Sequence, residues 1–188
     1  MRLLYGRHFE ARYAAIAAEV SDGASVVDVC CGDCYLYLAY LRHKSVRYLG
    51  LDLSPQLVQW ARRRQVEARQ FNVWQDELAH GDVVIMQASL YQFLPQAKWV
   101  VNQLLSAARQ KVIITEPIRN VSSSGNPWIA TVGHRLTVPG GADAAYSGQR
   151  FDRKSLTELF ESFETFERSW LIPGGREMVG VFRGQGDA

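Results

Sequence analysis

The sequence predicts an α/β fold, a three-layer sandwich in which helices cover both faces of a mostly parallel sheet. Short apolar runs alternate with stretches of helical periodicity along the chain. These runs are rich in Val, Ile and Leu, as expected for strands that are buried on both faces. The last two runs are joined by Pro173-Gly174-Gly175, which predicts a closing antiparallel hairpin.

The first half of the chain alternates predicted helices and strands. Ser54 suits the N-cap of a helix and Pro55 suits its first turn, and we expect this helix to end near Arg64. The other expected elements are a helix over 8–20, a strand over Ser25–Val29, a helix over Tyr35–Leu41, a strand over Val46–Leu51 and a strand over Glu67–Phe71.

The second half continues this alternation as far as an irregular stretch over 118–150. The β-branched run Val83-Val84-Ile85 supports a strand. A later strand should stop at Glu116-Pro117, because proline removes a backbone donor. The expected elements are a strand over Asp82–Met86, a helix over Gln96–Gln110, a strand over Lys111–Thr115, a capped helix over Asp152–Phe163, and strands over Phe166–Ile172 and Glu177–Phe182.

Length and composition indicate one soluble domain over 1–188. The chain is 47% hydrophobic and carries a formal charge of +2, which gives no broad field for nucleic acid. The run Arg62-Arg63-Arg64 fits a solvated helix end. No segment has the length and apolarity of a membrane span or a secretory leader. The three cysteines crowd into Cys30–Cys34 and suit a reducing, cytoplasmic location.

Two motifs point to a ligand site. The segment Val26–Cys34 is a buried strand that ends in a tight turn of small residues before a helix, where free N–H groups are available to an anionic group. Asp52 ends the next strand, 24 residues after Asp28. An acid at this place in Rossmann-type sites accepts hydrogen bonds from ribose hydroxyls. The two motifs together therefore predict a nucleoside-containing ligand.

These motifs resemble those of the class I methyltransferases that depend on S-adenosylmethionine (SAM). Asp28-Val29-Cys30-Cys31-Gly32 resembles the first motif of that family, and Gly50-Leu51-Asp52-Leu53-Ser54 resembles the second. The resemblance implies a Rossmann-like fold with a seven-stranded sheet and a C-terminal antiparallel hairpin. It covers most of the chain outside residues 118–150, which we expect to be an insertion that covers the substrate.

The resemblance also implies a set of SAM-binding residues. Gly32 would pass close to the methionine part, Asp52 would hold the ribose, and Leu53 would cover one adenine face. Asn72 would bind the adenine amine, with Asp76 as the competing choice. The implied set is Asp28, Cys30, Gly32, Cys34, Asp52, Leu53, Asn72 and Gln87.

Methyl transfer from a sulfonium needs alignment more than a catalytic triad. The resemblance puts Tyr91 near the transferred methyl, and Glu116 and His134 are candidates to orient the acceptor or accept its proton. We expect a small-molecule acceptor, with Arg119, Arg135 and Arg150 suited to an anionic one. No metal, nucleic acid or membrane partner is expected, and the protein would be a monomer or homodimer.

Cys34 leaves two alternative functions open. The first is a SAM-binding or regulatory module without catalysis, because Cys34 stands where the family has its last glycine. The other is a thiol redox protein, because Cys31-Gly32-Asp33-Cys34 is a CxxC sequence between a strand and a helix. Zinc lacks a fourth ligand near the cysteines, and the GxGxxG sequence of nicotinamide sites is absent from this turn.

Overall fold

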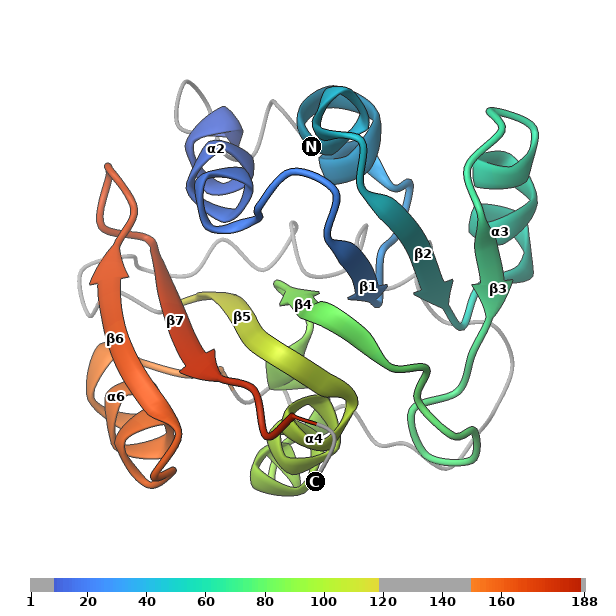
Figure 1. Ribbon diagram of the computed structural model, residues 1–188. Helices are drawn as coiled ribbons and strands as arrows, with labels where there is room; N and C mark the ends of the chain where they lie inside the picture. Colours follow the sequence, from blue (N-terminus) through green and yellow to red (C-terminus); the bar gives the residue numbers. More distant parts are fainter. Residues whose placement is uncertain (1–8, 119–149, 187–188) are drawn as a thin grey trace, which may run out of the picture.

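A computed structural model describes residues 9–118 and 150–186. They form a seven-stranded sheet in the order β3-β2-β1-β4-β5-β7-β6 (Figure 1). The strands from β3 to β5 are parallel to their neighbours, and β7 is antiparallel to both β5 and β6. The predicted α/β sandwich and its closing hairpin are confirmed. The strands are β1 (Ser25–Val29), β2 (Arg47–Asp52), β3 (Ala68–Gln70), β4 (Gly81–Gln87), β5 (Ala108–Pro117), β6 (Phe166–Leu171) and β7 (Glu177–Arg183).

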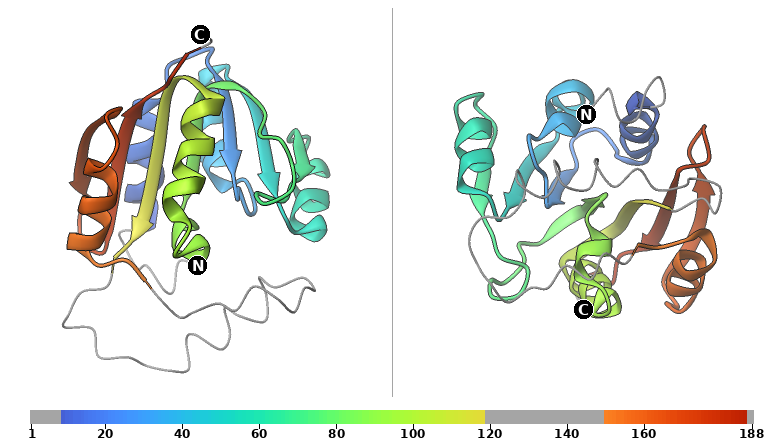
Figure 2. Two further views of the ribbon diagram at one scale, coloured as in Figure 1. Left: turned by 90° about the horizontal axis from the view of Figure 1, so that it is seen from below. Right: turned by 180° about the vertical axis from the view of Figure 1, so that it is seen from behind.

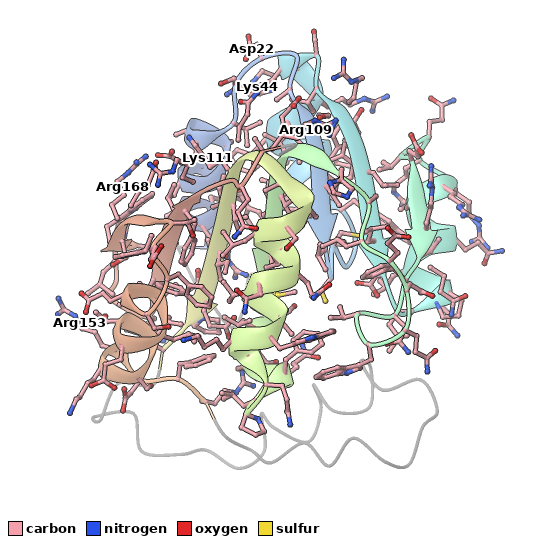
Figure 3. The ribbon with its side chains drawn as sticks, turned by 60° about the horizontal axis from the view of Figure 1, so that its bottom comes forward. Asp22, Lys44, Arg109, Lys111, Arg153 and Arg168 are labelled. Atoms are coloured by element: carbon pink, nitrogen blue, oxygen red, sulfur yellow. The ribbon has the colours of Figure 1, made fainter. Side chains whose placement is uncertain are left out.

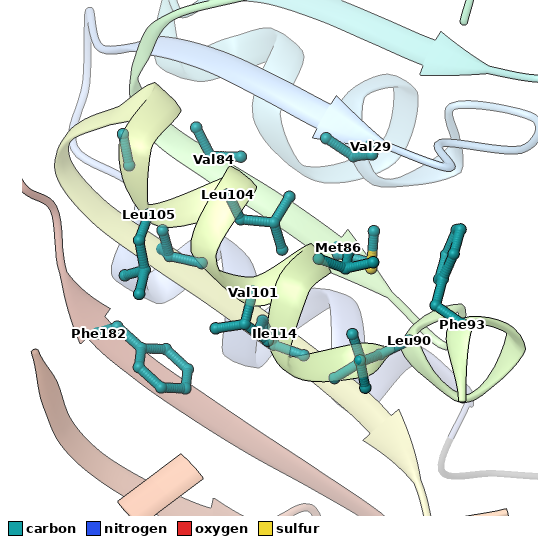
Figure 4. Packing of buried hydrophobic residues seen from close by; sticks show 14 of the residues in the cluster. Val29, Val84, Met86, Leu90, Phe93, Val101, Leu104, Leu105, Ile114 and Phe182 are labelled. Atoms are coloured by element: carbon teal, nitrogen blue, oxygen red, sulfur yellow. The ribbon is translucent and has the colours of Figure 1, made fainter. Parts of the chain in front are cut away.

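Helices cover both faces of the sheet. α2 (Phe9–Glu19), α3 (Pro55–Arg62) and the helical segment that follows β1 cover one face, and α4 (Ala97–Ala107) and α6 (Arg153–Glu161) cover the other (Figure 1). A separate apolar core fills the space between the sheet and the helices on each face. α4 buries Val100, Val101, Leu104 and Leu105, whose spacing forms one helical stripe. This stripe packs on β4 and β5 (Figure 4).

Several predicted elements differ in type or extent from those in the structure. The segment after β1 includes a π-helical turn at Tyr37–Leu41 instead of a continuous α-helix. β3 pairs over only three residues, Ala68–Gln70. α4 ends at Ala107 and β5 begins at the next residue, because Ala108 pairs with Gly81 of β4. Pairing with a neighbouring strand therefore overrides the local helical pattern.

β5 ends at Pro117, so it stops at Glu116-Pro117 as expected, but both of these residues belong to the strand. β4 ends at Gln87, opposite Thr115, so β5 has only β7 as a neighbour beyond that point. Pro117 pairs with Glu177, and the next residue, Ile118, donates its N–H to Arg176 O at 2.9 Å. The missing proline N–H therefore removes no bond to β4.

The two edges of the sheet differ in character. The parallel strands end along one edge (Figure 2). Near the opposite edge, Figure 3 shows the labelled charged groups of Asp22, Lys44, Arg109 and Lys111. Lys111 Nζ lies 2.9 Å from Glu19 Oε2, and Arg109 Nε lies 3.6 Å from Asp82 Oδ1. Lys111 and Arg109 are thus held in ion pairs, whereas ligands of such folds bind at the carboxyl ends of the strands.

Candidate functional site

The two predicted motifs meet at the carboxyl edge of the sheet. The N–H of Gly32 donates to Asp52 Oδ2 at 2.8 Å, and the N–H of Ser54 donates to Asp52 Oδ1 at 2.9 Å. Burial raises the pKa of Asp52, and these two N–H donors oppose that rise. Asp52 therefore links the turn after β1 to the start of α3.

The turn after β1 has an unusual backbone. Cys30, Gly32 and Cys34 have φ values of 58°, 58° and 52°. A Cβ placed on Gly32 would meet no other heavy atom within 4 Å, so this position is open to a ligand. The two cysteines adopt the left-handed conformation that glycine adopts most easily. Cys34 thus adopts a left-handed conformation at the position where the resembling family has its last glycine.

Cys34 does not project into the candidate site. It is fully buried, and its Sγ lies 3.5 Å from Cys31 Sγ. A Cβ placed on Gly50 would lie 2.9 Å from Cys31 Sγ and 3.0 Å from Cys34 Sγ, so both sulfurs face β2. The Cys34 side chain therefore packs in the core, and the part of Cys34 available to the candidate site is its backbone.

Asp28 lies beneath the turn and is fully buried. Tyr48 Oη donates to Asp28 Oδ2 at 2.8 Å, and Gln87 Nε2 lies 3.2 and 3.1 Å from Oδ1 and Oδ2. Burial raises the pKa of Asp28 to about 7, against the opposing effect of both hydrogen bonds. Asp28 therefore joins β2, β1 and β4 just below the turn.

The residues expected to contact adenine follow β2 and β3. Leu53 is 47% exposed directly after β2. Asn72 follows β3, and its N–H donates to Asp76 Oδ2 at 2.7 Å while its Oδ1 accepts from the Trp74 N–H at 3.0 Å. The two competing residues Asn72 and Asp76 thus belong to one hydrogen-bonded turn.

Glu116 lies at the carboxyl end of β5 and is fully buried. Its Oε2 accepts from the N–H of Leu90 at 2.9 Å, and its Oε1 has no hydrogen-bond partner within residues 9–118 and 150–186. Burial raises the pKa of Glu116 to about 8. Tyr91 follows Leu90, and the Arg150 guanidinium carbon lies 3.4 Å from the Tyr91 ring centroid. The structure thus brings Glu116, Tyr91 and Arg150 to one region.

Several expected residues lie outside the described residues, namely His134, Arg119 and Arg135. The described part of the chain contains no group of three or more His, Cys, Asp or Glu residues that could hold a metal ion. None of its helices combines the length and apolarity needed to cross a bilayer.

Sequence reasoning missed two groups near this edge. Tyr48 fits a buried strand position, and nothing local signals that its hydroxyl reaches Asp28. Arg12 of α2 is buried, and its Nη2 lies 3.0 Å from Glu177 Oε1 at the start of β7. Helical periodicity predicts an apolar residue at such a position, so only the fold identifies this ion pair.

Comparison with solved structures identifies the fold as that of SAM-dependent methyltransferases. The chain matches magnesium protoporphyrin IX methyltransferase (ChlM) from Synechocystis PCC 6803, solved with bound SAH, with a TM-score of 0.69 and 13% identity over 98% of this chain and 92% of that chain. A SAM-dependent methyltransferase from Aquifex aeolicus matches with a TM-score of 0.66 and 14% identity over 97% and 95%.

A third match is the chain assigned as a methyltransferase in a complex with the Haloferax volcanii Trm112 methyltransferase activator. Its TM-score is 0.72, with 14% identity over 97% of this chain and 92% of that chain. No curated protein sequence matches the chain. A family model described as methionine biosynthesis protein MetW matches residues 10–121, which is more than half of the chain. The protein therefore belongs to the MetW family.

Proposed function

We propose that this protein is an enzyme that transfers the methyl group of SAM to a small-molecule acceptor. The observation that carries the proposal is the bond from the Gly32 N–H to Asp52, which joins a tight turn to an acid suited to ribose. SAM supplies a sulfonium methyl group: the acceptor bonds to the methyl carbon, the carbon–sulfur bond breaks, and S-adenosylhomocysteine (SAH) leaves with the electron pair. The protein's contribution is chiefly alignment.

Each predicted cofactor residue has a proposed role consistent with its surroundings. The open face of Gly32 would admit the methionine part of SAM, and Asp52 would accept hydrogen bonds from the ribose. Exposed Leu53 would cover adenine, and Asn72 would bind its amine. Asp28, Cys30 and Gln87 would serve the methionine end, with Cys34 shaping the turn from within the core.

The proposed acceptor is anionic. The Arg150 guanidinium stacks on Tyr91 next to the end of β4, where it would attract a carboxylate. The family description, methionine biosynthesis, favours an acceptor of amino-acid type. Glu116 would hold the segment after β4 through Leu90 and orient an acceptor hydroxyl, and because its pKa is raised to about 8 it would accept a proton only at higher pH, where it is ionised. The proposal also includes His134 as a residue that orients the acceptor or accepts its proton. Residues 118–150 would cover the substrate, and the protein would be cytoplasmic.

Titration with SAM and SAH by calorimetry tests the cofactor. We expect one site per chain for each ligand, and no binding would overturn the proposal. Incubation with SAM that carries a labelled methyl group, and with pools of anionic metabolites, tests transfer. Labelled product together with SAH supports an enzyme, whereas binding without SAH release in every pool supports a non-catalytic SAM-binding module. Methylation only of RNA or protein would overturn the small-molecule acceptor.

A further inference from the structure

The ring of Tyr48 reaches Asp28 because Gly50 has no side chain. Asp28 and Gly50 are register partners in the parallel pair β1–β2. A Cβ placed on Gly50 would lie 3.3 Å from Tyr48 Cε1, so the tyrosine ring extends over this glycine toward Asp28. Tyr37 stacks on the ring, with 4.5 Å between the centroids and 21° between the planes. Packing therefore holds the ring, and the hydroxyl alone makes the bond to Asp28.

The bonds of Asp28 also orient Gln87. An ionised carboxylate only accepts hydrogen bonds, so the Gln87 amide must turn its nitrogen toward Asp28 and its oxygen away from it. Gln87 is partly exposed at the carboxyl end of β4, beside the candidate site. A protonated Asp28 would present an O–H to two donors and could no longer accept fully from both. Ionised Asp28 therefore fixes a residue of the site.

We propose that Tyr48 is a positioning residue of the cofactor site, whose hydroxyl keeps Asp28 ionised so that Asp28 can hold Gln87. The inference rests on the SAM-binding function proposed above. SAM carries a positively charged sulfonium, so loss of the negative charge on Asp28 also removes an attraction. We therefore expect SAM affinity to follow the ionisation of Asp28.

Other titratable groups face Asp28 and must be separated from Tyr48. The negative charges of Asp52 and Asp33 raise the pKa of Asp28 further. Tyr13 of α2, Cys30 and Cys31 also interact electrostatically with Asp28. Tyr48→Phe leaves all five groups in place and keeps the aromatic ring. A comparison of this variant with the unmodified protein therefore isolates one hydroxyl.

The experiment measures the dissociation constant of SAM between pH 5.5 and pH 9, and the ¹³C NMR titration of Asp28 without ligand. We expect Tyr48→Phe to raise the midpoint of both curves by about one pH unit, because a donor to the charged form is lost. SAM binding should be about fivefold weaker at pH 7 and equal to that of the unmodified protein near pH 9. Tyr37→Phe, which removes a hydroxyl from the stacked ring, should leave both midpoints unchanged.

An unchanged midpoint in either titration, or a loss of affinity that is equal at every pH, would overturn the role of Tyr48. Asp28→Asn provides a second measurement if Tyr48→Phe does not fold. Its SAM affinity should lose the pH dependence that we assign to Asp28, and retention of that dependence would overturn the inference. Failure of the unmodified protein to bind SAM at any pH would instead overturn the proposed function.

Discussion

The N–H of Gly32 donates to Asp52 Oδ2 at 2.8 Å, so the turn after β1 and the acid after β2 form one hydrogen-bonded unit. The other carboxylate oxygen accepts from the Ser54 N–H, directly before α3. A ligand bound at Asp52 therefore lies against a turn whose backbone the same carboxylate holds.

Asp52→Ala should weaken SAM binding at least about tenfold. The substitution removes the carboxylate that is proposed to accept hydrogen bonds from the ribose. It also removes the acceptor for the N–H groups of Gly32 and Ser54. Hydrogen bonds to charged groups contribute about 1.5–3 kcal/mol each. Calorimetric titration measures the change. Glu67→Gln is the control, since the Glu67 side chain is 62% exposed and the substitution should not alter affinity. Unchanged affinity in Asp52→Ala would contradict the assigned role.

Gly50→Ala should destabilise the protein by about 1–3 kcal/mol, because the added methyl overpacks the core against Cys31 Sγ at 2.9 Å. Denaturant unfolding measures this loss. Cys31→Ala removes the nearest sulfur and should recover at least about 0.5 kcal/mol in the double variant. Cys30→Ala is the matched control and should recover nothing. If Gly50→Ala destabilised the unmodified protein, the Cys31→Ala variant and the Cys30→Ala variant equally, the Cys31 sulfur would not limit the space beside Gly50.

Glu116 should make the protein less stable as pH rises. Burial raises its folded pKa from 4.5 to about 8, so between these values the folded state holds a proton that the unfolded state has released. Its stabilising contribution is complete below pH 4.5 and is lost as pH rises through about 8. Glu116→Gln retains an acceptor for the Leu90 N–H and should flatten this dependence in urea unfolding at pH 5 to 8.5. Exposed Glu158→Gln is the control, and an equal slope in Glu116→Gln would contradict the assignment.

The thiols of the CxxC sequence should react slowly in the folded protein. Cys31 and Cys34 are buried, and the hydrogen bond between the two thiols, followed by burial, raises the pKa of Cys31. Burial also raises the pKa of Cys30 to about 12. Because the thiolate is the reactive form, we expect alkylation by iodoacetamide at pH 7.5 to be at least about 100-fold slower than in urea. A thiol that reacts faster when folded would support the redox interpretation instead.

Local patterns were sufficient for the order of the elements. Apolar runs alternate with amphipathic stretches, and a chain with this alternation buries both faces of its strands only beneath helices. Ser54 and Asp152 cap the helices predicted to start after them. The positions of Gly32 and Asp52 are predictable for the same reason, because Gly32 lies in the turn after β1, Asp52 ends β2, and parallel strands end at one edge.

Contacts between distant segments decided the rest. β5 starts at Ala108 because Gly81 pairs with it, although the local sequence favours a longer helix. Cys34 faces the core because Gly50 leaves space for its sulfur, and Tyr48 reaches Asp28 across the same glycine. Hydrophobic periodicity depends on neighbours along the chain and is therefore readable from the sequence. The direction of a buried polar or sulfur group depends on which strands become adjacent, and only the tertiary structure decides that.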